Sequence, residues 1–222
     1  MSLTLYYHPL SSYCHKVLIA LYECEAPFDK RIIDLGNEPD RAELQALWPL
    51  GKFPVIRDHE RNRAVAESTI IIEYLDHFFA GARRLIPADW DAAFEVRAWD
   101  RFCDQYVHGP MQLVVKDKIR GARGDLNKER AQLETAYRML DEHMAGRTWA
   151  VRDTFSMADC AAAPSLFFSR TLQAFPEKLG HLSAYFDRLM DRPSTRRVLD
   201  EAKPYFHMYP FADAIAPRFR AA

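Results

Sequence analysis

The sequence lacks several features that would place the chain in a specialised class of protein. No apolar run approaches the roughly 20 residues that a membrane-spanning helix requires. The formal net charge is −1, so there is no overall basic field to attract nucleic acid. The first residues lack the basic segment, apolar segment and cleavage site of a secretory leader. We therefore expect a cytoplasmic protein that binds neither membrane nor nucleic acid.

Cysteine is also sparse. The chain has four cysteines, whose spacing matches neither a disulfide framework nor a zinc motif: Cys14, Cys24, Cys103 and Cys160. The histidines likewise show no metal-ligand spacing, so we expect reduced thiols and no metal ion. The 222 residues, 49% of them hydrophobic, are enough for one large domain or two small ones.

The first 80 residues combine strand and helix patterns. Apolar periodicity and turn residues predict strands at Leu3–Tyr7, Phe28–Ile33, Phe53–Arg57 and Arg63–Ala66, and helices at Ser12–Cys24, Glu38–Trp48 and Ser68–Phe79. The predicted order is β-α-β-α-β-β-α. Its first β-α-β should form a parallel unit, and the closing hairpin should add antiparallel strands to the same sheet.

Strand patterns disappear after residue 80. Residues 81–89 have the Gly, Pro and polar content of a linker. From Trp90 onward the apolar residues recur at helical spacing, and one such face carries Phe94, Ala98, Phe102 and Tyr106. We predict an α/β domain over 1–80, a linker over 81–89 and an all-α domain over 90–222.

Residues 11–14 read Ser-Ser-Tyr-Cys where the first strand meets the first helix. The spacing is that of a C-x-x-C redox motif with serine at the first position. A helix N-terminus stabilises an anion, and a serine hydroxyl there can donate to a thiolate that arrives with a ligand, which lowers the thiol pKa. Alternatively, Ser11 and Ser12 only cap the helix. Cys14 can be either a packed thiol or a reactive one.

Two further short motifs suggest a peptide-like ligand. Pro54 opens a predicted strand, and a cis bond before it would leave the Val55 backbone open to pair with an extended peptide; a plain trans turn is the alternative. Glu67 and Ser68 open the third predicted helix. Ser68 can cap that helix or receive a carboxylate, and Glu67 can receive an ammonium group. A ligand with an α-amino acid end would therefore satisfy both Glu67 and Ser68.

Taken in order, these motifs resemble the soluble, cytosolic-type glutathione transferase family. The matching segments are Ser-Ser-x-Cys, Gly-Lys-x-Pro-Val and Glu-Ser-x-x-Ile-x-x-Tyr-Leu, and the later Phe-Ser-Met-Ala-Asp at 155–159 is similar to the family's folding motif. The resemblance covers essentially the whole chain. It implies a thioredoxin-like N-terminal domain followed by an all-helical C-terminal domain, a homodimer, and a detoxifying enzyme that attacks small electrophiles with glutathione. It does not assign a class.

The resemblance also implies roles for individual residues. It places Ser11 first and Ser12 second as the hydroxyl that activates the glutathione thiol, and Cys14 at the second-cysteine position of glutaredoxins. The implied glutathione-binding set is Ser11, Lys52, Phe53, Pro54, Val55, Glu67 and Ser68. In that set Pro54 is the cis-proline, and the Val55 backbone pairs with the cysteinyl residue. Glu67 and Ser68 hold the γ-glutamyl end, and Lys52 reaches a carboxylate.

The substrate side is less defined. In the family the electrophile pocket lies between the domains, so Tyr106 and His108 are candidate lining residues. Tyr106 also fits an apolar stripe, and His108 can simply mark the irregular stretch before Gly109. Three other functions stay open: a glutathione-dependent thiol–disulfide reductase that uses Cys14, a zeta-like isomerase or dehalogenase, and a non-catalytic interaction protein.

Overall fold

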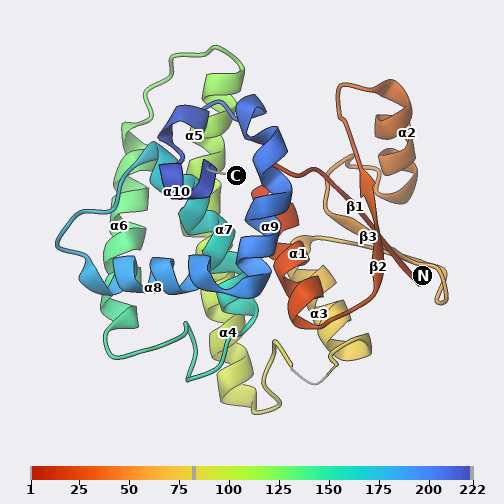
Figure 1. Cartoon of the computed structure of the whole chain (residues 1–222), viewed down its shortest axis with the longest axis horizontal. Coiled ribbons are helices and arrows are strands. Elements are labelled where there is room, and N and C mark those ends of the chain that lie inside the picture. Colours follow the sequence, from red (N-terminus) through yellow and green to blue (C-terminus); the bar gives the residue numbers. More distant parts are fainter. Residues whose placement is uncertain (1, 82–83, 221–222) are drawn as a thin grey trace. The chain divides into compact units, whose positions relative to one another are not determined.

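The chain changes architecture near Ile86. The computed structural model describes residues 2–81 and 84–220 (Figure 1). Unit 1 ends at Ile86 and contains the described strands, and unit 2 begins at Pro87 and is helical. Residues 82–83 of the predicted linker lie outside the described residues. The predicted fold class, a thioredoxin-like domain followed by a helical one, is confirmed.

Unit 1 is built on a mixed sheet with strand order β2-β1-β3-β4. The strands are β1 (Leu3–Tyr7), β2 (Phe28–Ile32), β3 (Val55–Asp58) and β4 (Arg63–Ala66). β1 runs parallel to β2 and antiparallel to β3, which in turn pairs antiparallel with β4. The predicted parallel β-α-β unit and antiparallel hairpin are therefore both present.

Three described helices cover this sheet: α1 (Ser12–Glu23), α2 (Glu38–Leu47) and α3 (Ser68–Phe78). α1 and α3 pack against each other, and α2 lies on the opposite side of the sheet (Figure 1). Leu44 of α2 joins Ile33 and Val55 in a buried cluster, with Tyr6 of β1 packed against it. Because side chains alternate along a strand, the buried Leu5 of β1 faces the other layer, which α1 and α3 cover.

The described part of unit 2 is a set of helices joined by short connections. They are α4 (Trp90–Phe102), a π-helical segment η1 (Cys103–His108), α5 (Gly109–Ile119), α6 (Asn127–Met144), α7 (Met157–Leu172), α8 (Gly180–Asp191), α9 (Pro193–Ala202), the 3₁₀ segments η2 (Lys203–Met208) and η3 (Ala212–Ala214), and α10 (Pro217–Arg220). Within residues 2–81 and 84–220, no helix combines the length and apolarity needed to cross a bilayer.

The apolar stripe predicted on α4 is not the core face. Phe94 and Tyr106 are exposed, whereas Val96 and Val107 are buried. Burial follows the other helical face because the small residues Ala92 and Ala93 allow close packing there. The aromatic face consequently stays available at the surface of the chain.

The buried start of α7 is organised by one carboxylate. Asp159 has no exposed surface, and it accepts hydrogen bonds from the Ser156 N–H (2.8 Å) and the Ser156 hydroxyl (3.0 Å). It also accepts from the Ala150 N–H (2.9 Å) and the Tyr185 hydroxyl (2.6 Å). Ser156 and Asp159 thus form a capping box at the N-terminus of α7. Burial raises the pKa of Asp159, and its four hydrogen bonds oppose that shift.

This network predicts a large stability effect. Asp159→Ala would leave four buried donors without their acceptor, so we expect the free energy of unfolding to fall by about 3–5 kcal/mol in urea titrations. Asp125 is a matched control, because it is exposed and accepts one hydrogen bond, from the Asn127 N–H. Asp125→Ala should change the free energy of unfolding by about 0.5 kcal/mol or less. Equal effects of the two substitutions would contradict the role of Asp159 as the acceptor that organises the start of α7.

Candidate functional site

The ends of three neighbouring strands meet at one edge of the sheet in unit 1. Tyr6, near the end of β1, is paired with Val55 at the start of β3, and Val55 is paired with Ala66 at the end of β4. The first motif begins at Ser11, four residues after the end of β1; the second ends at Val55, and the third begins directly after β4. The register therefore gathers segments from residues 11, 55 and 67 that are far apart in sequence.

The two serines of the first motif differ in exposure. Ser11 is the N-cap of α1 and half-buried, and its Oγ accepts a hydrogen bond from the Cys14 N–H at 3.3 Å. A hydroxyl that accepts can still donate its own proton, so capping and ligand binding are compatible. Ser12 is only 2% exposed. Of the two, Ser11 has more surface with which to contact a ligand.

Cys14 is a packed thiol. It has no exposed surface and forms no disulfide. Burial raises the pKa of the Cys14 thiol to about 12, although hydrogen bonds from Ser11 and from the His8 backbone act in the opposite direction. A thiol in this state stays protonated at neutral pH, and it offers neither the thiolate nor the access that a redox nucleophile needs.

The loops around the second motif contact each other. The Phe53–Pro54 peptide bond is cis, as the family resemblance implied. The Phe53 ring stacks on His8, with 6.0 Å between ring centroids and 18° between planes. His8 accepts at Nδ1 from the Leu10 N–H (3.2 Å), and burial lowers the His8 pKa. Lys52, which precedes Phe53 in the sequence, is exposed.

The third motif contains a strained backbone. Glu67 has φ 69° and ψ 116°, a region that side chains other than glycine rarely occupy. Such residues cost about 1–3 kcal/mol and cluster at binding sites. Glu67 is the N-cap of α3 but its exposed side chain makes no capping hydrogen bond, whereas Ser11 and Asn37 cap α1 and α2. Ser68, the first residue of α3, is largely buried.

The two candidates on the substrate side have different surroundings. Tyr106 is exposed and its ring contacts Phe102, with centroids 5.4 Å apart. His108 has no exposed surface, and its Nδ1 lies 3.3 Å from Asp104 Oδ1. Burial argues against contact between His108 and a substrate, and this contact stays a prediction. His108 is the last residue of the π-helical segment η1, whose buried residues also include Val107.

Sequence reasoning missed a polar contact beneath this edge. Lys16 of α1 is fully buried, and its Nζ donates to the Thr69 hydroxyl at 2.9 Å. One signal was available, because a lysine interrupts the apolar run of α1 one turn after Ser12. The stacking of His8 on Phe53 had no comparable signal.

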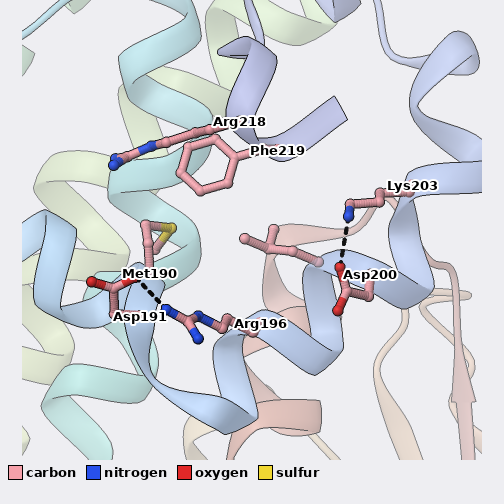
Figure 2. Close-up of a pocket in the computed structure, with 8 residues that line it drawn as sticks. Met190, Asp191, Arg196, Asp200, Lys203, Arg218 and Phe219 are labelled. Atoms are coloured by element: carbon pink, nitrogen blue, oxygen red, sulfur yellow. Dashed lines mark hydrogen bonds and ion pairs between the residues drawn. The ribbon is translucent and has the colours of Figure 1, made fainter. Parts of the chain in front are cut away.

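A separate hollow in unit 2 contains none of the predicted site residues. Its volume is about 270 Å³, and it is lined by Met190, Asp191, Arg196, Leu199, Asp200, Lys203, Arg218 and Phe219 (Figure 2). Its cations already have carboxylate partners: Arg196 pairs with Asp191 (2.7 Å), and Lys203 pairs with Asp200 (2.8 Å). Across the described residues, no group of three His, Cys, Asp or Glu side chains gathers to hold a metal ion.

Comparison with known proteins agrees with this arrangement. The family model "Glutathione S-transferase, N-terminal domain" matches residues 10–77, and "Glutathione S-transferase, C-terminal domain" matches residues 102–193. Glutathione S-transferase GstB of Escherichia coli (strain K12) is 25% identical over 206 residues, which cover 89% of this chain and 97% of that protein. A probable maleylacetoacetate isomerase of Vibrio cholerae is 26% identical over 215 residues, covering 92% and 98%.

A solved structure extends the similarity to three dimensions. It is a glutathione S-transferase from Methylobacillus flagellatus with glutathione bound, 26% identical, with a TM-score of 0.78. The alignment covers 89% of this chain and 98% of that one. Family models thus match both the N-terminal and the C-terminal part of the sequence, and the solved structure matches most of the chain. The chain therefore belongs to the glutathione S-transferase family.

Proposed function

We propose that unit 1 binds glutathione and that the chain is a transferase, which activates the bound thiol for attack on a small electrophile. The observation that carries this proposal is the register that aligns Tyr6, Val55 and Ala66. Neighbouring strands lie about 4.8 Å apart, so the edge from β1 to β4 spans about 10 Å. An extended tripeptide has about the same length.

Each motif then meets one part of the ligand. Ser11 donates a hydrogen bond to the cysteinyl sulfur and stabilises its thiolate beside the N-terminus of α1. The Val55 backbone, directly after the cis Phe53–Pro54 bond, pairs with the cysteinyl residue. Glu67 and Ser68 receive the ammonium and carboxylate of the γ-glutamyl end, where the N-terminus of α3 favours an anion.

Exposure supports two further assignments. Lys52 is exposed next to the Phe53 loop, so its ammonium can reach a glutathione carboxylate. Of the two candidates for contact with the electrophile, exposure favours the Tyr106 ring over His108. The protein's contribution is thiolate stabilisation and positioning, and it requires no metal ion.

The alternatives differ in support. A reductase that uses Cys14 requires a reactive thiol, and the burial of this side chain argues against it. An isomerase or dehalogenase of the zeta type would use the same activated glutathione, and the similarity to the Vibrio cholerae protein favours keeping the isomerase as a second candidate. A non-catalytic interaction protein would not need the strained Glu67. We also propose that the protein acts in detoxification and is located in the cytoplasm.

The role of Ser11 can be tested directly. In Ser11→Ala we expect glutathione still to bind, but the pKa of its thiol should rise towards the value of about 8.5 for a free thiol. Turnover with an activated aryl halide should fall about 100-fold, as for loss of one anion-stabilising donor. The measurements are calorimetric titration and thiolate absorbance. Ser12→Ala is the matched control and should change the thiol pKa and the turnover less than Ser11→Ala does. If Ser12→Ala has the larger effects, Ser12 is the activating residue.

The reductase alternative has its own test. Cys14→Ala should leave glutathione affinity and aryl halide turnover within about twofold of wild type, because a buried protonated thiol takes no part in the reaction. Cys24→Ala is the control, since Cys24 is also a buried thiol of unit 1. Complete loss of activity in Cys14→Ala alone, with the protein still folded, would support the reductase instead.

We also propose a homodimer. The exposed face of α4 carries Trp90 and Phe94, 74% and 64% exposed, and an apolar patch of this kind marks an interaction surface. Light scattering should give the mass of two chains for wild type and of one chain for Phe94→Asp. Ile119→Asp, on the exposed Ile119 of α5, should stay dimeric. A wild type that is monomeric at micromolar concentration would refute the proposal.

A further inference from the structure

The contact between Lys16 and Thr69 links the two helices that carry the proposed glutathione-binding groups. Lys16 lies four residues after Ser12, so both are on one face of α1. Thr69 is the second residue of α3, directly after Ser68. Their 2.9 Å hydrogen bond therefore joins α1 to the first turn of α3.

A fully buried lysine is an unusual choice for packing alone. Removing an ammonium group from water is costly unless hydrogen bonds compensate, and a leucine or methionine would fill the same space without that cost. α1 and α3 already bury apolar residues, including Leu18, Leu21, Ile72 and Leu75. Apolar contacts hold helices together but tolerate sliding, whereas a hydrogen bond constrains both distance and direction.

We propose that Lys16 and Thr69 are positioning residues for glutathione, which fix the N-terminus of α1 relative to that of α3. This inference rests on the proposed function. One ligand is held at both ends, with its sulfur at Ser11 and its γ-glutamyl group at Glu67 and Ser68. When the γ-glutamyl end is seated on α3, the position of α1 decides whether Ser11 reaches the sulfur. A shift of about 1 Å at a reacting centre can cost up to 100-fold in rate.

A second contact fixes the other half of α3. The Tyr74 hydroxyl donates to the buried Asp58 of β3 at 2.7 Å, and the Arg61 N–H donates to the same carboxylate at 2.9 Å. α3 is thus tied to the sheet through Tyr74 and to α1 through Thr69. Loss of the Thr69 contact should free only the end of α3 where the ligand binds.

The test uses substitutions that spare the lysine. Thr69→Val keeps the shape of the side chain and removes its hydroxyl, and Thr69→Ser restores the hydroxyl. Thr171→Val is the matched control, because the Thr171 hydroxyl is also part-buried and lies 2.9 Å from another side chain, the Tyr209 hydroxyl in unit 2. For each protein we would measure glutathione affinity, the pKa of the bound thiol and the melting temperature.

We expect Thr69→Val to bind glutathione about tenfold more weakly and to raise the pKa of the bound thiol. Thr69→Ser should recover both values, and Thr171→Val should match wild type in both. Thr69→Val should melt at a lower temperature than Thr171→Val, because the buried Lys16 ammonium loses an acceptor. Affinity and thiol pKa are therefore measured well below both melting temperatures, and recovery in Thr69→Ser identifies the hydrogen bond.

Three results would overturn the inference. If Thr69→Val binds glutathione within twofold of wild type with the same thiol pKa, the contact does not position the ligand, and the proposed function stands. If Thr69→Ser fails to recover binding, the methyl packing matters rather than the hydrogen bond. If wild type does not bind glutathione at millimolar concentration, the proposed function falls and this inference falls with it.

Discussion

The place of β3 between β1 and β4 is the constraint on which the proposed site depends. Val55, Ile56 and Asp58 have no exposed surface, so β3 is packed on both of its faces. A slip of one residue would exchange those faces and expel buried side chains, and burial therefore fixes the register. The same register brings the end of β1, the start of β3 and the end of β4 to one edge. Without it, the serine, cis-proline and Glu-Ser motifs would be unrelated loops.

The proposed chemistry of that edge depends on two sulfur atoms, the buried one of Cys14 and the one that glutathione would bring. Cys14 is protonated and enclosed, so it leaves no reactive sulfur of its own in the first motif. Ser11 keeps a hydroxyl beside the N-terminus of α1, where a thiolate is stabilised by the helix dipole and by a hydrogen bond. In the proposed function, serine at the first position of the C-x-x-C spacing means that the reactive sulfur belongs to the bound glutathione and not to the protein.

The local structure was predictable from sequence because short-range patterns determine it. The predicted strands at Leu3–Tyr7 and Arg63–Ala66 match β1 and β4 residue for residue. Contacts between residues far apart in the sequence were not predictable. Lys16 and Thr69 are 53 residues apart, and no periodicity links them.

Periodicity also does not say which apolar face of a helix is buried. In α4, the helix face with Phe94 and the face with Val96 both have apolar residues at helical spacing. The structure buries the face with Val96 and exposes Phe94. The burial of His108 was not predictable for a related reason, since the π-helical turn of η1 gives side chains other positions than a regular helix would. The positive φ of Glu67 had no sequence signal, because glutamate rarely adopts that conformation.

The central claim is that one glutathione molecule contacts three segments of unit 1 together. Backbone hydrogen exchange with and without glutathione tests this most directly. We expect glutathione to slow exchange in residues 11–14, at Val55 and in residues 67–70, and to leave exchange around the hollow at Arg196 and Lys203 unchanged. Protection confined to that hollow, or to a single one of the three segments, would contradict it.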